Sequence, residues 1–310
     1  MEIAERPEEV EGGAGGVVLA AGFFDGVHLG HRAILDAAHD LARERGAAAW
    51  ALTFDPHPLA VLAPDRAPPL LTPGPMRFDA LAAAGVERCL RLPFTAETAA
   101  LAPADFVSRV LDPIAARTGA LAVVAGPNWR FGAGRAGTLA SLPFETLEVP
   151  FVDRGGAPVS STRIREAIAA GDLGEAAAML GRPYETRETA LPAARGRGVG
   201  TALGAPTANV FPSAPVLPPP GVYALDVRLS GEDAPRRAVA NFGFRPTFPD
   251  ARPDRPLLEI HVLGAVPDDL HGIPLSIFWL RRLRDERTFD TPAALAMQIR
   301  SDAAEAAAIA

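Results

Sequence analysis

The chain has 310 residues, of which 48% are hydrophobic and 22% are charged, and its formal net charge is −7. This length suits about two domains of ordinary size. The acidic balance argues against a broad nucleic-acid-binding surface, and the single cysteine, Cys89, excludes an intrachain disulfide and a cysteine-rich zinc site.

All thirty basic residues are arginines, because the sequence contains no lysine. This excludes the phosphate loop GxxxxGK followed by Ser or Thr, and any lysine base or Schiff base. A phosphate site in this chain must therefore use arginine, histidine, backbone amides or a metal. Residues 1–16 lack the basic start and apolar core of a signal peptide, and no run approaches the ~18 apolar residues of a membrane span. We expect a cytoplasmic protein with neither a membrane nor a nucleic-acid partner.

The first half of the chain alternates short apolar stretches with helical patterns. This rhythm predicts a doubly wound parallel sheet, which binds ligands at the carboxyl ends of its strands. The loop from Gly126 to Gly137 follows such a strand end and is placed to contact a ligand. The predicted strands cover residues 17–21, 48–54, 89–92 and 120–125, and the predicted helices cover 32–45, 75–84 and 104–118.

The ten residues GFFDGVHLGH, from Gly22 to His31, form the most informative motif. They connect the strand 17–21 to the helix 32–45, so His28 and His31 lie where a strand leads into a helix. Backbone N–H groups and the positive end of the helix dipole point at a bound anion there. Two imidazoles at this position predict a phosphate site, although the pair alone could also be a helix cap and a surface histidine.

Residues 160–165, SSTRIR, begin a further helix whose free N–H groups Ser or Thr can cap, with Arg165 about one turn inside. A second short helix is predicted at 171–181. Beyond it the pattern changes to alternating apolar and polar residues between turns, which indicates a β-barrel or sandwich. We place the boundary so that residues 1–185 and 186–310 form the two domains. The later predicted strands are 221–229, 237–241, 257–263 and 273–283, followed by an Ala-rich helix at 291–310.

The ordered motifs resemble a known family. GxFDGxHxGH followed by an SSTxIR helix start resembles the HxGH nucleotidyltransferases. The full set is more closely similar to the bacterial bifunctional riboflavin kinase/FMN adenylyltransferases (FAD synthetases), over nearly the whole chain. The further motifs are TFDPHP (53–58), the glycine-rich loop 128–137, APTAN (205–209), GVY (221–223), NFGFRPTF (241–248), EIH (259–261) and LR (283–284).

For the N-terminal domain the resemblance implies that FMN is adenylylated by ATP to FAD with release of pyrophosphate. His28 and His31 would be catalytic, since charge builds on the α-phosphoryl oxygens during an in-line displacement. Ser161, Thr162 and Arg165 would hold the outer phosphates of ATP. The other implied ATP-binding residues are Gly22, Phe24, Asp25, Gly26 and Gly30, and the implied flavin-binding residues of this domain are Asp55, Pro56, His57, Pro58 and Asn128. Arg284 is the implied flavin-binding residue of the C-terminal domain.

For the C-terminal domain the resemblance implies ATP-dependent phosphorylation of riboflavin to FMN, on a six-stranded antiparallel β-barrel with a terminal helix. Thr207 and Asn209 would bind Mg²⁺ through oxygen, and Glu259 would be the general base. Alternation along the strand leaves open whether Glu259 faces solvent. The glycine-rich stretch 196–204, with Gly196, Gly200 and Gly204, would wrap the nucleotide phosphates with its backbone amides.

Three alternatives remain at this point. The glycine stretch of the kinase half is irregular, with Leu191 where a glycine is usual, so the chain could be an FMN adenylyltransferase with an impaired kinase domain. It could also be a flavin-binding regulator without catalysis, although such a protein needs no base at Glu259. A cytidylyltransferase acting on a phospho-alcohol is disfavoured by the C-terminal domain. The sequence does not specify an oligomeric state.

Overall fold

The computed structural model describes residues 1–191, 207–244, 256–264 and 270–309. The contacts divide the chain into two compact units, Met1–Ser161 and Thr162–Ala310. The boundary at residue 185/186 stays a prediction, because this division groups the helical residues 162–180 with the second unit. No helix in the described part is long and apolar enough to cross a membrane.

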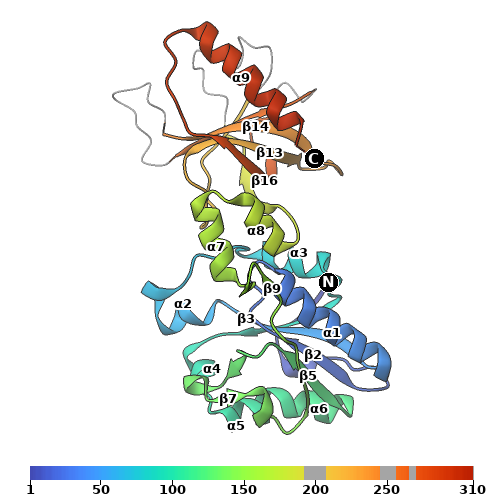
Figure 1. Ribbon diagram of the computed structural model, residues 1–310. Helices are drawn as coiled ribbons and strands as arrows, with labels where there is room; N and C mark the ends of the chain where they lie inside the picture. The colour runs from blue at the N-terminus through green and yellow to red at the C-terminus, as the bar shows by residue number, and fades with distance from the viewer. Residues whose placement is uncertain (192–206, 245–255, 265–269, 310) are drawn as a thin grey trace. The chain divides into compact units, whose positions relative to one another are not determined.

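The first unit is built on a parallel six-stranded sheet, in the order β1-β4-β3-β2-β5-β8 (Figure 1). This confirms the predicted doubly wound class. The edge strands β1 and β8 escaped prediction because they are short and mostly exposed. The strands are β1 (Glu2–Ala4), β2 (Val17–Ala21), β3 (Ala48–Asp55), β4 (Arg88–Pro93), β5 (Leu121–Ala125) and β8 (Glu145–Glu148).

Helices cover both faces of this sheet, as the buried positions of its central strands require. The helices of this unit are α1 (Leu29–Arg45), α2 (Pro58–Leu62), α3 (Pro75–Ala83), α4 (Ala96–Ala100), α5 (Pro103–Phe106) and α6 (Asp112–Thr118). Two short hairpins complete it, β6 (Arg130–Phe131) with β7 (Gly137–Thr138) and β9 (Asp153–Arg154) with β10 (Ala157–Pro158).

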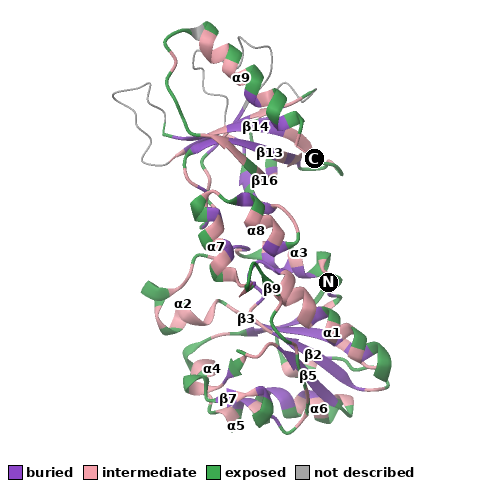
Figure 2. Cartoon of the chain, viewed as in Figure 1, coloured by how far each residue is buried: buried purple, intermediate pink, exposed green. Residues whose placement is uncertain are grey.

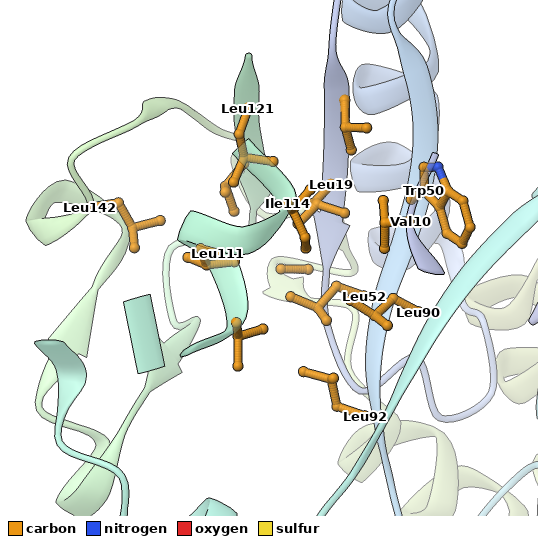
Figure 3. Packing of buried hydrophobic residues seen from close by; sticks show 14 of the residues in the cluster. Val10, Leu19, Trp50, Leu52, Leu90, Leu92, Leu111, Ile114, Leu121 and Leu142 are labelled. Carbon is orange, nitrogen blue, oxygen red and sulfur yellow. The ribbon is translucent and has the colours of Figure 1, made fainter. Parts of the chain in front are cut away.

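Alternate residues of the strands enter separate cores on the two faces. Leu19 and Leu52 pack with Ile114 of α6 on one face, shown in Figure 3, whereas Val18 and Ala51 pack with Leu35 of α1 on the other. The central strands are accordingly buried along their length (Figure 2).

The helix predicted at 104–118 is interrupted. A π-helical stretch, Val107–Leu111, separates α5 from α6, and the Asp112 N–H donates to the Val107 carbonyl five residues earlier. Pro113 explains the break, because it has no N–H to continue the regular helical pattern.

The second unit contains two helices, an antiparallel sheet and a terminal helix. The sheet order is β11-β16-β13-β14-β15-β12, which confirms the predicted six antiparallel strands. Leu191, just beyond β11, donates its N–H to the Asn209 carbonyl of β12 at 2.8 Å, so the two end strands are joined there. The elements are α7 (Ser161–Ala170), α8 (Leu173–Leu180), β11 (Tyr184–Thr189), β12 (Thr207–Val210), β13 (Gly221–Leu229), β14 (Arg236–Gly243), β15 (Leu257–Val262), β16 (Pro274–Arg284) and α9 (Pro292–Ala307).

One face of this sheet forms an aromatic core. The rings of Tyr223 and Phe242 contact Trp279 edge-on, at centroid distances of 5.1 and 5.8 Å. The Trp279 indole N–H donates to the buried Thr186 hydroxyl at 3.1 Å, so its polar atom is satisfied inside the core. Helix α9 packs on the opposite face, where Ala306 meets Val222 and Val239.

Candidate active sites

The phosphate motif lies at the switch point of the parallel sheet. The connection from β2 leads to β3 on one side, and β5 pairs with β2 on the other. Ligands bind outside the strand ends at such a point. The loop after β2 carries His28, and the loop after β5 carries Asn128. Both sequence motifs therefore belong to the edge of the sheet where this fold binds ligands.

The loop between β2 and α1 has an unusual backbone. Phe24, Gly26 and Val27 have φ values of 61°, 83° and 42°. For the two residues that are not glycine, this left-handed conformation costs about 1–2 kcal/mol each. Both side chains are fully buried in the core beneath α1, which offsets that cost. The Phe24 side chain is therefore part of the core, and only its backbone is left to contact a nucleotide.

Asp25 is buried and its carboxylate is engaged. Oδ1 accepts from the N–H groups of Leu71 and Thr72 at 2.9 and 3.0 Å, and from the Thr72 hydroxyl at 3.3 Å. The Gly26 N–H donates to the same Thr72 hydroxyl at 2.9 Å. These contacts indicate that Asp25 fixes the loop, so a direct role in ATP binding stays a prediction.

His28 and His31 form a stacked pair at the start of α1. His28 is the N-cap, and its Nδ1 accepts the His31 N–H at 3.3 Å. The ring centroids are 3.6 Å apart and the rings are nearly parallel, at 16°. Burial, and secondarily the neighbouring His28, hold the pKa of His31 well below its usual range. His31 is thus neutral at pH 7, and its buried Nδ1 has no hydrogen-bond partner among the described residues.

Two small residues and one arginine complete this region. A Cβ at Gly30 would lie 3.2 Å from the His28 ring, and one at Gly22 would lie 3.0 Å from the Phe24 ring. Arg32, in the first turn of α1, has a buried Nε without a partner, and no acid in the described part pairs with its guanidinium. Sequence reasoning missed Arg32, although its place directly after His31 was a usable signal.

The predicted flavin loop, Asp55–Pro58, is tied to the same region. Asp55 ends β3 and pairs with Arg77 of α3 at 3.1 Å, and His57 caps α2 by accepting the Leu59 N–H at 3.0 Å. The His57 ring contacts the Phe23 ring edge-on, with the two ring centroids 4.4 Å apart. The Arg77 guanidinium lies 4.3 Å from the centroid of the same Phe23 ring.

Arg77 is buried and was missed by sequence reasoning. Burial lowers the pKa of its guanidinium, while Asp55 and Asp25 act in the opposite direction. No short-range pattern marks it, because its partners Phe23 and Asp55 lie 54 and 22 residues away.

Asn128 and the SSTRIR residues are placed as follows. Asn128 is exposed, and its carbonyl accepts from Arg135 at 3.4 Å. The Ser161 hydroxyl donates to the Asp25 carbonyl at 2.9 Å, and both residues belong to the first compact unit. Thr162 and Arg165 belong to the second compact unit. Their contact with ATP stays a prediction.

The kinase residues of the second unit lie in one cross-strand row. Glu259 of β15 is in register with Asn209 of β12 on one side and with Asn241 of β14 on the other. Asn209 Oδ1 is buried without a partner among the described residues. Thr207 is in register with His261, two positions along the same strands. Asn241 was missed, although strand pairing opposite Glu259 places it in the row, and its Nδ2 donates to Glu286 at 3.0 Å.

Other predicted residues of this unit are elsewhere. The Arg284 guanidinium pairs with Asp302 of α9 at 2.7 Å, and this ion pair would compete with a contact to the flavin. The assignment of Arg284 to flavin binding stays a prediction. Gly196, Gly200 and Gly204 lie outside the described residues. No group of three His, Cys, Asp or Glu side chains in the described ranges could hold a metal ion.

A hollow of about 510 Å³ in the second unit is separate from this row. Arg187, Arg228 and Ser276 line it, on β11, β13 and β16. The row Asn209–Glu259–Asn241 lies on β12, β15 and β14, and none of the predicted kinase residues lines the hollow.

Comparisons with known proteins match both halves of the chain. A family model described as FAD synthetase covers residues 12–163, and one described as riboflavin kinase covers 180–310. Proteins named bifunctional riboflavin kinase/FMN adenylyltransferase include one from Bacillus subtilis, 32% identical over 93% of this chain and 91% of its own length. Another, from Escherichia coli, is 36% identical over 97% and 93%.

Among solved structures, a crystal structure described as a macrolide-efflux protein from Streptococcus pneumoniae has a TM-score of 0.82 and 26% identity, and covers 99% of both chains. It supports the fold. Since a riboflavin kinase model matches the second half, the alternative of an adenylyltransferase with an impaired kinase domain is not favoured.

Proposed function

The chain belongs to the family of bifunctional riboflavin kinase/FMN adenylyltransferases, and on this premise we propose which residues carry its two activities. It is a transferase that converts riboflavin to FMN and FMN to FAD, with ATP as co-substrate of both steps. We assign adenylyl transfer to the loop Gly22–His31 and phosphorylation to the row Asn209–Glu259–Asn241.

In adenylyl transfer, a phosphate oxygen of FMN attacks the α-phosphorus of ATP and pyrophosphate leaves. His28 and His31 sit at the N-terminus of α1, where the helix dipole and free N–H groups favour phosphate oxygens. Neutral His31 stabilises the developing charge as a hydrogen-bond donor rather than as a cation. Arg32 is the nearby cation without an acidic partner in the described part, and we assign it to the phosphates of ATP.

In phosphorylation, Glu259 takes the proton of the riboflavin 5′-hydroxyl as that oxygen attacks the γ-phosphorus of ATP, and ADP leaves. The support for Glu259 is its position in register between two amide side chains, Asn209 and Asn241. A positioned general base of this kind contributes about 10²–10⁴-fold to the rate.

The residues of this row fit Mg²⁺. Its preferred ligands are oxygens, few of them from the protein, because it retains water and shares the phosphates of the nucleotide. Asn209 Oδ1 is a buried oxygen that lacks a partner among the described residues, and Thr207 begins the same short strand. Asn209 and Thr207 would hold the ion, which would neutralise phosphate charge. Cytoplasmic location and the absence of a nucleic-acid partner stay predictions.

The observation that carries these assignments is that each site holds buried polar atoms with no partner among the described residues: His31 Nδ1 and Arg32 Nε at the first site, and Asn209 Oδ1 at the second. In an incubation with riboflavin, ATP and Mg²⁺, FMN and then FAD should appear. His28→Ala should slow FAD formation about 100- to 1000-fold and leave FMN formation intact.

Glu259→Gln should have the reverse effect, stopping FMN formation while FMN supplied from outside is still converted to FAD. Each variant is thus the folding control for the other. Equal loss of both activities in either variant, or unchanged FAD formation in His28→Ala, would contradict the assignment.

A further inference from the structure

Residues 71 and 72, between α2 and α3, hold the loop Gly22–His31 through hydrogen bonds to Asp25 and Gly26. Both of their backbone N–H groups donate to the Asp25 carboxylate, and the Thr72 side chain adds two further bonds. Asp25 and Thr72 are both buried. These bonds link segments that are 46 and 47 residues apart in the sequence.

The Thr72 hydroxyl bonds to two neighbouring residues of the loop at once. It accepts the Gly26 N–H at 2.9 Å and donates to Asp25 Oδ1 at 3.3 Å. A hydroxyl can do both, since it carries one donor hydrogen and two lone pairs. It therefore ties the backbone of residue 26 to the side chain of residue 25, in the stretch where Phe24, Gly26 and Val27 are left-handed.

Val27 is the one residue between Gly26, which Thr72 binds, and His28 of the histidine pair. Gly26 is held by Thr72, and His28 is already the N-cap of α1, whose Nδ1 accepts the His31 N–H. Any rotation at Gly26 or Val27 is transmitted to the His28 imidazole. Neither the Asp25 carboxylate nor the Thr72 hydroxyl is free to approach a nucleotide without giving up these bonds.

We propose that Thr72 is a positioning residue for adenylyl transfer. It holds the left-handed backbone of Phe24, Gly26 and Val27 so that His28 and His31 contact the α-phosphate in the geometry that the reaction needs. This inference rests on the proposed role of the histidine pair. Thr72 acts through Asp25 and Gly26 and does not touch the substrates. A misplacement of about 1 Å at reacting groups costs on the order of 100-fold in rate, so a loss of the hydroxyl should appear in kcat.

The test compares Thr72→Val with Thr72→Ser in the full-length enzyme. Valine keeps the shape and removes the hydroxyl, while serine keeps the hydroxyl. We expect Thr72→Val to lower kcat for FAD formation about 10- to 100-fold with little change in KM for ATP, and Thr72→Ser to stay near wild type. The riboflavin kinase rate of the same sample reports that the second unit is intact. Thr146→Val, on β8 of the first unit, is the matched control, because the Thr146 side chain makes no hydrogen bond within the described residues.

A double variant adds a readout that a purely structural role would not move. Because Asp25 and Thr72 act through one set of bonds, Asp25→Asn combined with Thr72→Val should cost little more in kcat than the worse single change. Equal activity of Thr72→Val and Thr72→Ser, or fully multiplicative losses, would overturn the proposal.

Two further arms keep the outcomes distinct. If Thr72→Val does not fold, Thr72→Cys replaces it, since a thiol is a weak donor and acceptor, and the same comparison with serine decides. His28→Ala is measured beside them. If His28→Ala forms FAD at the wild-type rate, the role assigned to the histidine pair is refuted. If His28→Ala forms FAD slowly but Thr72→Val forms it at the wild-type rate, only the positioning role of Thr72 is refuted.

Discussion

The stacked histidines set the electrostatics of the adenylyl-transfer loop. Two imidazoles with centroids 3.6 Å apart repel each other if both are protonated, and burial of His31 adds to the penalty. The free enzyme therefore keeps His31 neutral.

The pKa of His31 predicts how protons bind to this loop. In an NMR titration of the free enzyme, the His31 Cε1–H resonance should show no midpoint near 6.5, the usual histidine value, and His31→Gln should identify it. The unfolded chain takes up a proton below about pH 6.5 that folded His31 does not, so this residue lowers stability as the pH falls. A His31 midpoint at or above 6.5 would contradict the buried, neutral state.

At the residue level, sequence reasoning finds what is contiguous. His28 and His31 were identifiable because their spacing and the helix start are local features. Thr72 and Arg77 were not, since their hydrogen bonds are to residues 22 to 54 positions away. Asn241 lies between these cases, because it becomes visible once β14 is paired with β15 in the correct register.

Among the elements, α9 is attached to its sheet by specific polar contacts. Arg284 pairs with Asp302, whose side chain is 5% exposed, and Gln298 donates to the same carboxylate at 2.6 Å. Arg237 donates to the Ala306 and Ile309 carbonyls, both at 2.6 Å, at the C-terminal end of the helix, where a cation is favoured by the helix dipole. A second pair, Arg281–Glu305, is half exposed.

This contrast predicts a large and a small effect on stability. Asp302→Asn should destabilise the second unit by about 2–3 kcal/mol, because it leaves a mostly buried guanidinium with a weaker partner. Glu305→Gln should cost about 0–1 kcal/mol, as exposed ion pairs do. Urea unfolding followed by hydrogen exchange of the β13 and β14 amides measures both. Equal effects would show that the burial of Asp302 is unimportant.

The longer elements were predictable from periodicity, and the failures have physical causes. The strand 221–229 and the helix around 32–45 follow from their patterns. The helix at 104–118 hid a π-helical stretch, because Pro113 alters the hydrogen bonding without changing the apolar pattern. Strand β12, with four residues, is too short for alternation to reveal.

For the whole molecule, the lack of lysine places every fixed positive side-chain charge on arginine. Several of these arginines make contacts within the fold: Arg77 stacks on Phe23, Arg237 donates to a carbonyl at the C-terminal end of α9, and Arg284 pairs with Asp302. Planar guanidinium groups suit such bidentate and stacked contacts better than an ammonium does. Under the proposed assignments, other arginines, Arg32 and Arg165 among them, are the cations that contact the phosphates of ATP.

Chemical modification tests this dependence. An amine-acylating ester can react with the α-amino group but finds no lysine. Both activities should therefore stay within about twofold of the untreated enzyme, a change well under the tenfold that corresponds to about 1.4 kcal/mol. Phenylglyoxal, which modifies arginine, should abolish both, and saturating ATP should slow the loss. Inactivation by the acylating ester would show that an amine takes part after all.

The parallel pairing of β1 with β4 has a consequence for synthesis on the ribosome. Glu2–Ala4 finds its partner only at Arg88–Leu90, so more than eighty residues must be translated before this edge of the sheet can close. Until then, Ile3 and its neighbours are an unpaired strand edge, the kind of surface on which nascent chains associate wrongly. Pairing of this edge strand is thus a late step in the folding of the first unit during synthesis.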